Sequence, residues 1–404
     1  MTHGPSADPP ELSGQEFDRN PSPAYQYLRD HCPAYRMPLS GGAFAWLITR
    51  YDDAVAAMAD SRLSKSPDNA SAAWRRSGMG LPLDHRPSLA SHMVNADPPE
   101  HGRLRRLVAG AFAPKRMESL RTRTQQVADR ILDRIAPARR ADLVESLAYP
   151  LPITIICDLL GIPEHDRGSI QQWVAVLDSS GQHTSHSDLL TVTDAMDSFL
   201  AAQVAAKRRL PGDDLISELL SKQHVGAISD DEITSMAFLL LIGGHETATA
   251  LISNALLALL VHRDLADAAR AELDLVPQII EESLRLDSPI RNATWHFPIE
   301  PVVIAGQVMQ TGDPILVSLL AANRDPAAFD DADEFQIGRA ARHIAFGHGP
   351  HACIGAALAR MEGQIAISTV LRALPHLRLA APSDELQWWP SPIMRSLYAL
   401  PVAW

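Results

Sequence analysis

Cysteine is scarce in this chain of 404 residues, which has only Cys32, Cys157 and Cys353. No two of them are close enough in sequence to form a metal-binding CxxC pair. An odd number of widely spaced cysteines fits a reducing compartment and predicts a cytoplasmic protein. Each cysteine is therefore expected to be a small buried apolar side chain unless its surroundings indicate a reactive thiol.

Basic residues are also in deficit. The 36 lysines and arginines face 48 acidic residues, which gives a formal net charge of −12. Because nucleic-acid binders generally carry net positive charge, this balance argues against general nucleic-acid binding, although it allows a local basic patch. The hydrophobic content of 46% and the charged content of 21% exclude a disordered tail, a collagen-like fibre and a disulfide scaffold.

Long uninterrupted apolar runs are missing. The polar, proline-rich N-terminus lacks the charged start and apolar core of a signal peptide. The most apolar stretch, Met236–Val261, is interrupted by a Gly-Gly-His-Glu-Thr segment and is too polar to predict a membrane span. We therefore expect a soluble protein with no membrane association.

The sequence also contains no fixed-period repeat and no low-complexity linker. Length alone would allow two or three domains. Since nothing in the sequence divides the chain, residues 1–404 are interpreted as a single domain, in which the polar residues 1–20 form a flexible N-terminus. We expect this domain to be a monomer.

What the sequence does contain is helical periodicity, which predicts a mainly α protein with small β-sheets. The expected helices are 103–138 with a break at Pro114, 187–210, 214–222, 229–262, 265–286 with a break at Pro277, and 356–369. The expected strands are 44–48, 302–304 and 315–317, and residues 323–355 are expected to be rich in loops.

The helix over residues 229–262 is the longest, at roughly 50 Å. It starts with Ser229-Asp230-Asp231-Glu232, the pattern of a capping box. Gly243 and Gly244 in its middle each cost about 1 kcal/mol relative to alanine, which a close helix–helix contact would explain. Alternatively, Thr247 can hydrogen-bond back to the carbonyl of Gly243 and open the helix locally.

The segment from Phe346 to Gly355 is the most informative in the chain. Three glycines within nine residues permit a tight loop around Cys353. Backbone N–H groups in such a loop, together with the N-terminus of the helix that follows, would stabilise a thiolate. The residues alone leave two interpretations open: a functional thiolate that binds a metal or acts as a nucleophile, and a plain glycine-rich turn.

This segment resembles the haem-ligand loop of the cytochrome P450 superfamily, Phe-Gly-x-Gly-x-His-x-Cys-x-Gly. The resemblance implies the P450 fold, with haem b between the long central helix and the loop. It makes Cys353 the axial thiolate ligand of the iron. It also assigns Phe346 and Gly347 to the cofactor-binding loop and places His351 near a haem propionate.

Two further matches occur on expected helices. The segment Gly243–Thr247 resembles the oxygen-groove motif of the family, in which Thr247 and Glu246 would help deliver protons during dioxygen activation. Glu282 and Arg285 resemble its Glu-x-x-Arg pair, whose spacing puts both side chains on one helix face. The pair would brace the haem loop from behind and has no catalytic role.

The remaining matches concern the haem propionates. His101 and Arg105 resemble family residues that bind a propionate, and their spacing puts them on one helix face. The family usually has an arginine where this chain has His296. A histidine is fully charged only when it is protonated, so this contact is expected to be weaker and pH-sensitive, with Arg291 as a possible substitute.

The resemblance covers nearly the whole chain and is closest in appearance to actinobacterial enzymes that modify macrolides and other secondary metabolites. It implies a haem-thiolate monooxygenase that receives electrons from NAD(P)H through a separate ferredoxin and ferredoxin reductase. A basic docking surface for an acidic ferredoxin is expected around the proximal side. Its candidate residues are Arg103, Arg106, Lys115, Arg116, Arg342 and Arg360.

The resemblance also places the substrate pocket in residues 66–94, 159–192, 238–247, 290–297 and 391–395. The expected lining residues are Met93, Leu239, Ile242, Gly243, Trp295, Phe297 and Ile393. Their apolar character suggests a medium-to-large apolar ligand of the macrolide or polyketide type.

Three alternatives remain beside this prediction. The first is oxidative coupling of an aromatic peptide-derived metabolite, on which Trp295 would stack. The second is a haem protein that binds or senses ligands without oxygenating them, although it would not need Glu246 and Thr247. The third is a hydrolase with Cys353 as nucleophile, for which the nearby histidines rarely reach the required geometry.

Overall fold

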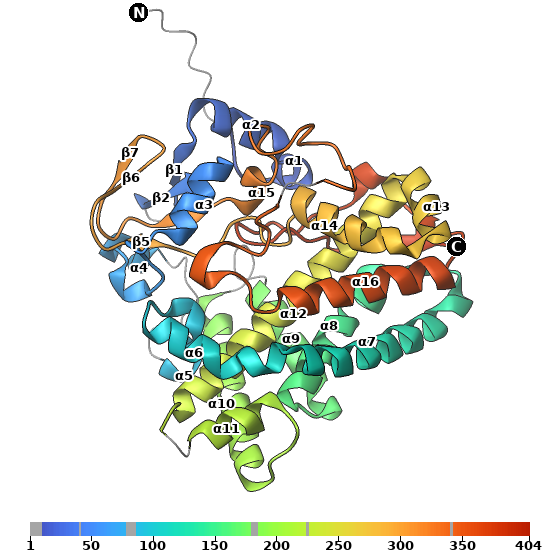
Figure 1. The fold of residues 1–404 in the computed structure, drawn as a ribbon, viewed down its shortest axis with the longest axis horizontal. Helices are drawn as coiled ribbons and strands as arrows, with labels where there is room; N and C mark the ends of the chain where they lie inside the picture. Colours follow the sequence, from blue (N-terminus) through green and yellow to red (C-terminus); the bar gives the residue numbers. More distant parts are fainter. Residues whose placement is uncertain (1–9, 40–41, 78–85, 179–184, 224–225, 340–341) are drawn as a thin grey trace, which may run out of the picture.

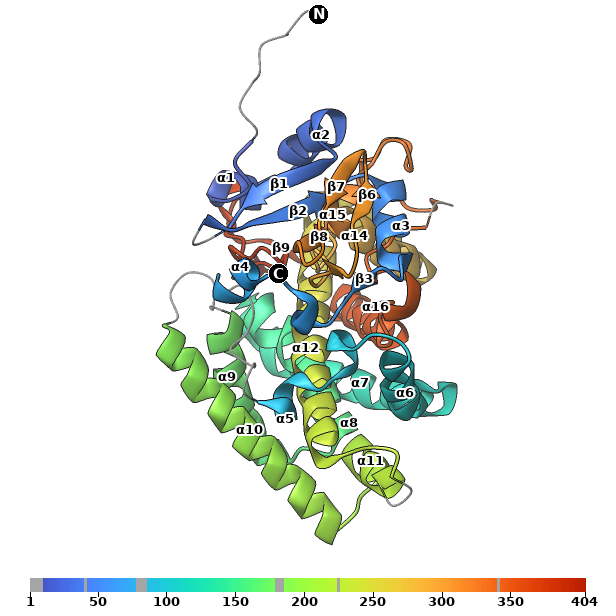
Figure 2. The ribbon, with the colours of Figure 1, turned by 90° about the vertical axis from the view of Figure 1, so that its left-hand side faces the viewer.

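The computed structural model describes residues 10–39, 42–77, 86–178, 185–223, 226–339 and 342–404. Its central element is the helix α12 (Asp230–Val261), which runs through the middle of the protein between α9 and α10 on one side and α6 and α7 on the other (Figures 1 and 2). Ser229 caps it as predicted: its side chain accepts from the N–H of Glu232, whose carboxylate accepts from the N–H of Ser229.

Among the described helices, only α12 is long and apolar enough to cross a membrane by length and composition. However, 67% of its apolar window is buried inside the protein. The helix packs against α5 (Pro87–Ala90), α8 (Pro150–Leu160) and α16 (Ala356–Ala373). Its apolar character is therefore that of a core helix.

The other helices surround α12. Seven of them correspond to the predicted ranges, and the rest, including α8, were not predicted. The larger ones are α6 (Glu100–Val108), α7 (Pro114–Ile135), α9 (Arg167–Asp178), α10 (His186–Arg209), α11 (Leu215–Gln223), α13 (Arg263–Ala271) and α14 (Val276–Leu286). The shorter ones are α1 (Gln15–Arg19), α2 (Ser22–His31), α3 (Tyr51–Ala59), α4 (Ala72–Arg76) and α15 (Leu319–Ala322).

Both predicted helix breaks are confirmed. At Pro114, α7 starts after a short 3-10 turn. Near Pro277, α13 ends at Ala271 and α14 begins at Val276, so that Pro277 lies in the first turn of α14. A proline costs little in the first turn, where its missing N–H would have no partner within the helix.

The described residues form four small sheets, and all three predicted strands are confirmed. The first sheet has the order β1 (Ala34–Pro38), β2 (Phe44–Ile48) and β8 (Ile315–Val317), and the second β4 (Arg140–Asp142), β10 (Pro401–Ala403) and β9 (Arg378–Leu379). The two-stranded sheets pair β3 (Leu63–Ser64) with β5 (Phe297–Pro298), and β6 (Val302–Ile304) with β7 (Gln307–Met309). The pairing of β3 with β5 joins segments that are far apart in the sequence.

The N-terminal segment departs from its prediction. The helix α1 packs Phe17 into the core, and the buried carboxylate of Asp18 forms an ion pair with Arg291 at 2.9 Å. Arg395 also donates to the carbonyl oxygen of Asp18. The expected flexibility of residues 1–20 is therefore wrong for Gln15–Arg19, while residues 1–9 lie outside the described part of the chain.

The predicted pair of Glu282 and Arg285 forms on α14. Arg285 is 1% exposed and donates twice to the Glu282 carboxylate, at 2.9 and 2.7 Å. It also donates to the carbonyls of Asn323, Ala332 and Glu334, at 2.9, 2.6 and 2.9 Å. The buried guanidinium thus ties the loop-rich segment after α15 to the helical part of the protein.

Glu362 on α16 gives a testable pH dependence of stability. It is 1% exposed, and neither carboxylate oxygen has a hydrogen-bond partner in the described structure. Burial raises its pKa from 4.5 to about 8, so the folded state favours the protonated form. Stability should be full below pH 4.5 and fall by on the order of a few kcal/mol as the pH rises to about 8.

Glu362→Gln should remove this fall, because the amide does not ionise. Urea unfolding at about pH 5 and about pH 8 measures it, with Glu118→Gln on the exposed surface of α7 as the control. If Glu362→Gln loses as much stability as the wild type between these pH values, the account of this residue is wrong.

Candidate active site

The glycine-rich loop around Cys353 lies against the end of α3 and leads into α16. Gly347 and Gly349 have positive φ values of 73° and 72°, which side-chain-bearing residues rarely adopt. A Cβ on Gly349 would also lie 2.7 Å from the carbonyl oxygen of Met58, near the end of α3. The loop is closed by a hydrogen bond from the N–H of Cys353 to the carbonyl of Phe346, at 2.8 Å. These glycines are therefore required by the conformation that presents Cys353.

The pKa of the Cys353 thiol is raised overall, because desolvation by the surrounding protein atoms outweighs the nearby groups that favour its ionised form. Three features lower that pKa: a hydrogen bond from the N–H of Gly355 and the positive charges of Arg105 and Arg360. Arg360 is held in place by Glu281, at 2.6 and 2.9 Å, and lies over the Phe346 ring. A metal cation bound to the sulfur of Cys353 would favour the thiolate form.

An accessible stripe runs along the middle of α12, which is otherwise mostly buried. The stripe consists of Leu239, Ile242, Gly243, Glu246 and Thr247, all at least partly accessible. Each of these residues lies three or four positions from another one in the set, so the five share one helix face. A Cβ on Gly243 would meet no atom within 4 Å. This face is therefore open in the middle of a core helix.

The two glycines of α12 have different environments. A Cβ on Gly244 would lie 2.8 Å from the Ile156 side chain of α8, so Gly244 permits the close helix contact. Gly243 lies on the open face, and its carbonyl accepts a hydrogen bond from the Thr247 hydroxyl at 2.9 Å. Both explanations that the sequence allowed thus apply, each to one glycine.

His245 faces away from this stripe. Its Nδ1 donates to the carbonyl of Leu241 at 2.7 Å, and its ring packs edge-on against Tyr149. Burial lowers the pKa of His245 to about 4, so the ring is neutral at neutral pH. Its Nε2 lies 4.0 Å from a carboxylate oxygen of Glu246, which makes it a neighbour of that carboxylate rather than its counter-ion.

Basic side chains gather beside the Cys353 loop. The rings of His101 on α6 and His351 in the loop lie 4.0 Å apart, centre to centre. Burial and the charges of His101, Lys65 and Arg105 lower the pKa of His351 to about 3. Burial, Lys65 and His351 hold the pKa of His296 well below its usual value. We call Lys65, His101, Arg105, His296 and His351 the basic cluster.

Among the described residues, Asp97 is the one carboxylate whose charge acts on the basic cluster, where it raises the pKa values of Lys65 and His101. An excess of buried basic groups favours an anionic partner. The sequence predicted every member of the cluster except Lys65. Lys65 comes close to Thr294 and His296 because β3 pairs with β5. No local sequence pattern predicts this contact.

Arg291 is not part of this cluster. Its guanidinium pairs with Asp18 and lies over the Phe17 ring. The expectation that Arg291 substitutes for the missing propionate-binding arginine is therefore wrong, because α1 already occupies this side chain.

The predicted pocket residues fall into two groups. Leu239, Ile242 and Gly243 lie on the accessible stripe of α12. Met93 and Phe297 are buried at 5% and 1% exposure in side-chain clusters, where Phe297 packs against Trp74. Trp295 also packs against Trp74 and, like Ile393, is half-buried. The pocket role of these residues stays a prediction, and parts of the expected pocket, residues 78–85 and 179–184, lie outside the described residues.

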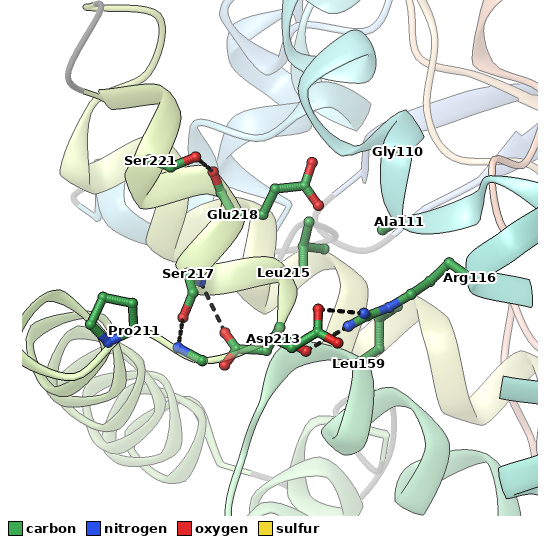
Figure 3. Close-up of a pocket in the computed structure, with 12 residues that line it drawn as sticks. Gly110, Ala111, Arg116, Leu159, Pro211, Asp213, Leu215, Ser217, Glu218 and Ser221 are labelled. Carbon is green, nitrogen blue, oxygen red and sulfur yellow. Dashed lines mark hydrogen bonds and ion pairs between the residues drawn. The ribbon is translucent and has the colours of Figure 1, made fainter. Parts of the chain in front are cut away.

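A separate polar cavity of about 240 Å³ lies between the start of α7 and α11 (Figure 3). Arg116 binds Asp213 at 2.8 Å on its wall, and Lys207 binds Asp214 at 2.7 Å. The cavity contains no residue of the Cys353 loop, the accessible stripe or the basic cluster. Its charged groups are paired with one another, so it does not belong to the candidate active site.

Only part of the expected docking surface has free cations. Arg103 pairs with Glu100 and Glu232, and Arg116 and Arg360 also have carboxylate partners. Among the described residues, Arg106, Lys115 and Arg342 are exposed and have no ion-pair partner. Sequence alone does not reveal this difference, since most of these pairings depend on tertiary contacts.

Comparison with known proteins decides the family. Residues 191–389 match the model of the family described as Cytochrome P450. The chain is 42% identical to cytochrome P450 monooxygenase PikC of Streptomyces venezuelae over 410 residues, which cover 99% of this chain and 96% of the relative. The chain belongs to the cytochrome P450 family. It is a cytochrome P450 monooxygenase, which removes the hydrolase and sensor alternatives.

Other P450s extend this result. The chain is 34% identical to polyketide biosynthesis cytochrome P450 PksS of Bacillus subtilis, with 96% of this chain and 97% of the relative covered. The crystal structure of the myxobacterial P450 CYP267B1 in complex with myristic acid matches with a TM-score of 0.93 and 37% identity, covering 98% of both chains. The mainly helical P450 fold with small sheets is thereby confirmed.

The family implies haem, and the residues of this P450 fit it. Cys353 offers a thiolate donor, stabilised by a backbone N–H and two arginines. In the basic cluster, Lys65 and Arg105 can supply positive charge for two propionate carboxylates, and the histidines can supply hydrogen bonds. The open face at Gly243 provides space for a ligand beside Thr247. Bound haem would supply the activation of dioxygen.

Proposed function

We propose that this P450 inserts one oxygen atom from O2 into a medium-to-large apolar secondary metabolite of the macrolide or polyketide type. The main support for this proposal is the accessible stripe of α12, which combines apolar side chains with Glu246 and Thr247 on one face. Such a face suits an apolar substrate held next to proton-donating groups. The similarity to a P450 of polyketide biosynthesis supports the substrate class.

The chain's own groups divide the work as follows. Cys353 binds the iron, and the basic cluster holds the propionates. Thr247 holds a proton on its hydroxyl oxygen, which Gly243 orients, and Glu246 on the preceding residue exchanges protons as a general acid and base. Leu239 and Ile242 exclude water from the substrate side of the same helix face.

A spectral titration of the purified haem-loaded enzyme tests the substrate class. Macrolactones and linear polyketides of medium size should displace the water at the ferric iron and shift the spectrum toward high spin, with micromolar affinity. Myristic acid and an aromatic dipeptide serve as comparison ligands. A high-spin shift with the aromatic dipeptide alone would contradict the proposal and favour oxidative coupling.

We further propose that electrons come from NAD(P)H through a separate ferredoxin and ferredoxin reductase. Arg106, Lys115 and Arg342 are exposed cations, which suit an acidic partner. Lys115 lies three residues after Phe112, and Phe112 lies beside Gly355 in the Cys353 loop, so this cation is close to the proposed haem site. Arg106→Glu combined with Arg342→Glu should slow ferredoxin-driven turnover about tenfold at low salt and less at high salt. Unchanged turnover at all salt concentrations would contradict this docking surface.

The remaining assignments are also proposals: one domain, a monomeric state and a cytoplasmic location. The absence of close cysteine pairs supports the location. Sedimentation of the haem-loaded protein tests the monomer, and a mass near twice 44.0 kDa would contradict it.

A further inference from the structure

Lys65 directly follows β3 and is 5% exposed. Its ammonium Nζ donates to the backbone carbonyl of Thr294 at 2.6 Å and to the Thr294 hydroxyl at 2.7 Å. An ammonium group has three N–H donors. Within the described part of the chain, the third has no acceptor. A buried lysine held by two neutral oxygens lacks the carboxylate partner that such a charge normally requires.

The nearest carboxylate does not fill this role. Asp97 acts on Lys65 through its charge but accepts hydrogen bonds from the Ser64 hydroxyl and from the backbone N–H of Lys65, at 2.5 and 2.8 Å. Burial lowers the pKa of Lys65 to about 7 despite this attraction. The ammonium group thus lacks a direct ionic partner.

An imidazole is also close to Lys65. The charge of Lys65 acts on His296 and helps to lower its pKa. Neutral imidazoles offer hydrogen bonds but no charge. At this end of the basic cluster, Lys65 is therefore the one described group that can supply a full positive charge at neutral pH once an anion binds.

We propose that Lys65, positioned by Thr294, binds a propionate carboxylate of the haem together with His296. It supplies the charge that the histidine at position 296 does not. The inference rests on the proposed haem-thiolate function and adds a cofactor-binding residue to it. Thr294 acts through Lys65 as a positioning residue.

The rate of haem loss tests this role without measuring turnover. Haem-loaded protein is mixed with an excess of a haem-free globin, and transfer is followed by absorbance. Lys65→Met, which keeps an unbranched side chain one atom shorter and removes its charge, should lose haem about 10- to 100-fold faster, as expected for one charge-assisted hydrogen bond. Lys65→Arg should restore most of the retention. Arg209→Met, which removes an exposed charge at the end of α10, is the control and should lose haem at the wild-type rate.

Haem dimethyl ester, whose propionates carry no charge, separates cofactor binding from structural effects. The difference between wild type and Lys65→Met should vanish with this cofactor. A Lys65→Met protein that loses the ester faster by the same factor would show that Lys65 supports the fold instead, and this would overturn the proposal. Equal loss of natural haem from wild type and Lys65→Met would overturn it too.

Two further results keep the inference separate from the proposed function. Thr294→Val removes one acceptor of Lys65 and should speed loss of natural haem about two- to tenfold. This variant tests the proposal if Lys65→Met does not fold. Thr294→Val with unchanged haem loss would count against the proposal. A wild-type protein that takes up no haem would refute the proposed function and this inference together, whereas haem-loaded wild type with an unaffected Lys65→Met refutes the inference alone.

Discussion

Cys353→Ala should lower substrate oxygenation by on the order of 10³-fold or more, because in the proposed function this residue provides the ligand on which the chemistry depends. The surrounding loop is expected to keep its conformation. Its closure rests on the backbone bond from residue 353 to Phe346 and on the positive φ values of Gly347 and Gly349, and alanine preserves these features. Product formation per enzyme, measured with saturating electron supply, gives the effect.

Cys32→Ala is the matched control, since Cys32 is a half-buried thiol at the end of α2. It should retain nearly full activity. The thermal unfolding of both variants should be compared with that of the wild type, so that a loss of folding is not mistaken for a loss of chemistry. Activity of Cys353→Ala within about tenfold of the wild type would mean that another group serves as the essential ligand.

Thr247→Ala should uncouple electron consumption from product formation. In the proposed function its hydroxyl holds the proton on the accessible stripe, and the variant loses the hydrogen bond to Gly243. We expect the product formed per NAD(P)H to fall about 10- to 100-fold, near the range of a positioned acid–base group. NAD(P)H consumption should continue, and hydrogen peroxide should replace the product.

Two variants make this test specific. Thr247→Ser keeps the hydroxyl and should recover most of the coupling. Thr249→Ala, slightly further along α12, removes a buried hydroxyl that has no hydrogen-bond partner in the described structure, and should leave coupling unchanged. Equal coupling in Thr247→Ala and wild type would remove Thr247 from proton delivery.

The parts of the site that sequence could predict are those formed by short segments. The Cys353 loop, the capping box at Ser229 and the pair of Glu282 with Arg285 each involve residues within one loop or one helix. Their glycine positions and i, i+3 spacings reflect local conformation, which does not depend on the rest of the fold.

The features that sequence missed depend on distant contacts. Lys65 reaches Thr294 across 229 positions, and Arg291 is occupied by Asp18 across 273 positions. Neither segment carries a local signal of its partner. The order of α1 likewise follows from that buried ion pair and not from its own composition, which is polar enough to suggest a flexible end.

The helix break near Pro277 also has a local cause. A proline disfavours the interior of a helix and is compatible with the first turn of a new one, which is where Pro277 lies. The paired glycines of α12 are ambiguous from sequence. Only the placement of α8 against Gly244 shows which glycine makes the close contact and which faces open space.

The absorption spectrum of the reduced, haem-loaded protein with carbon monoxide tests the central claim most directly. A thiolate from Cys353 opposite the bound gas should give the strongly red-shifted band after which the family is named. This band should be absent from Cys353→Ala and present in Cys32→Ala. A wild-type spectrum without the red-shifted band, or a Cys353→Ala protein that keeps it, would contradict the assignment of Cys353 as the haem ligand.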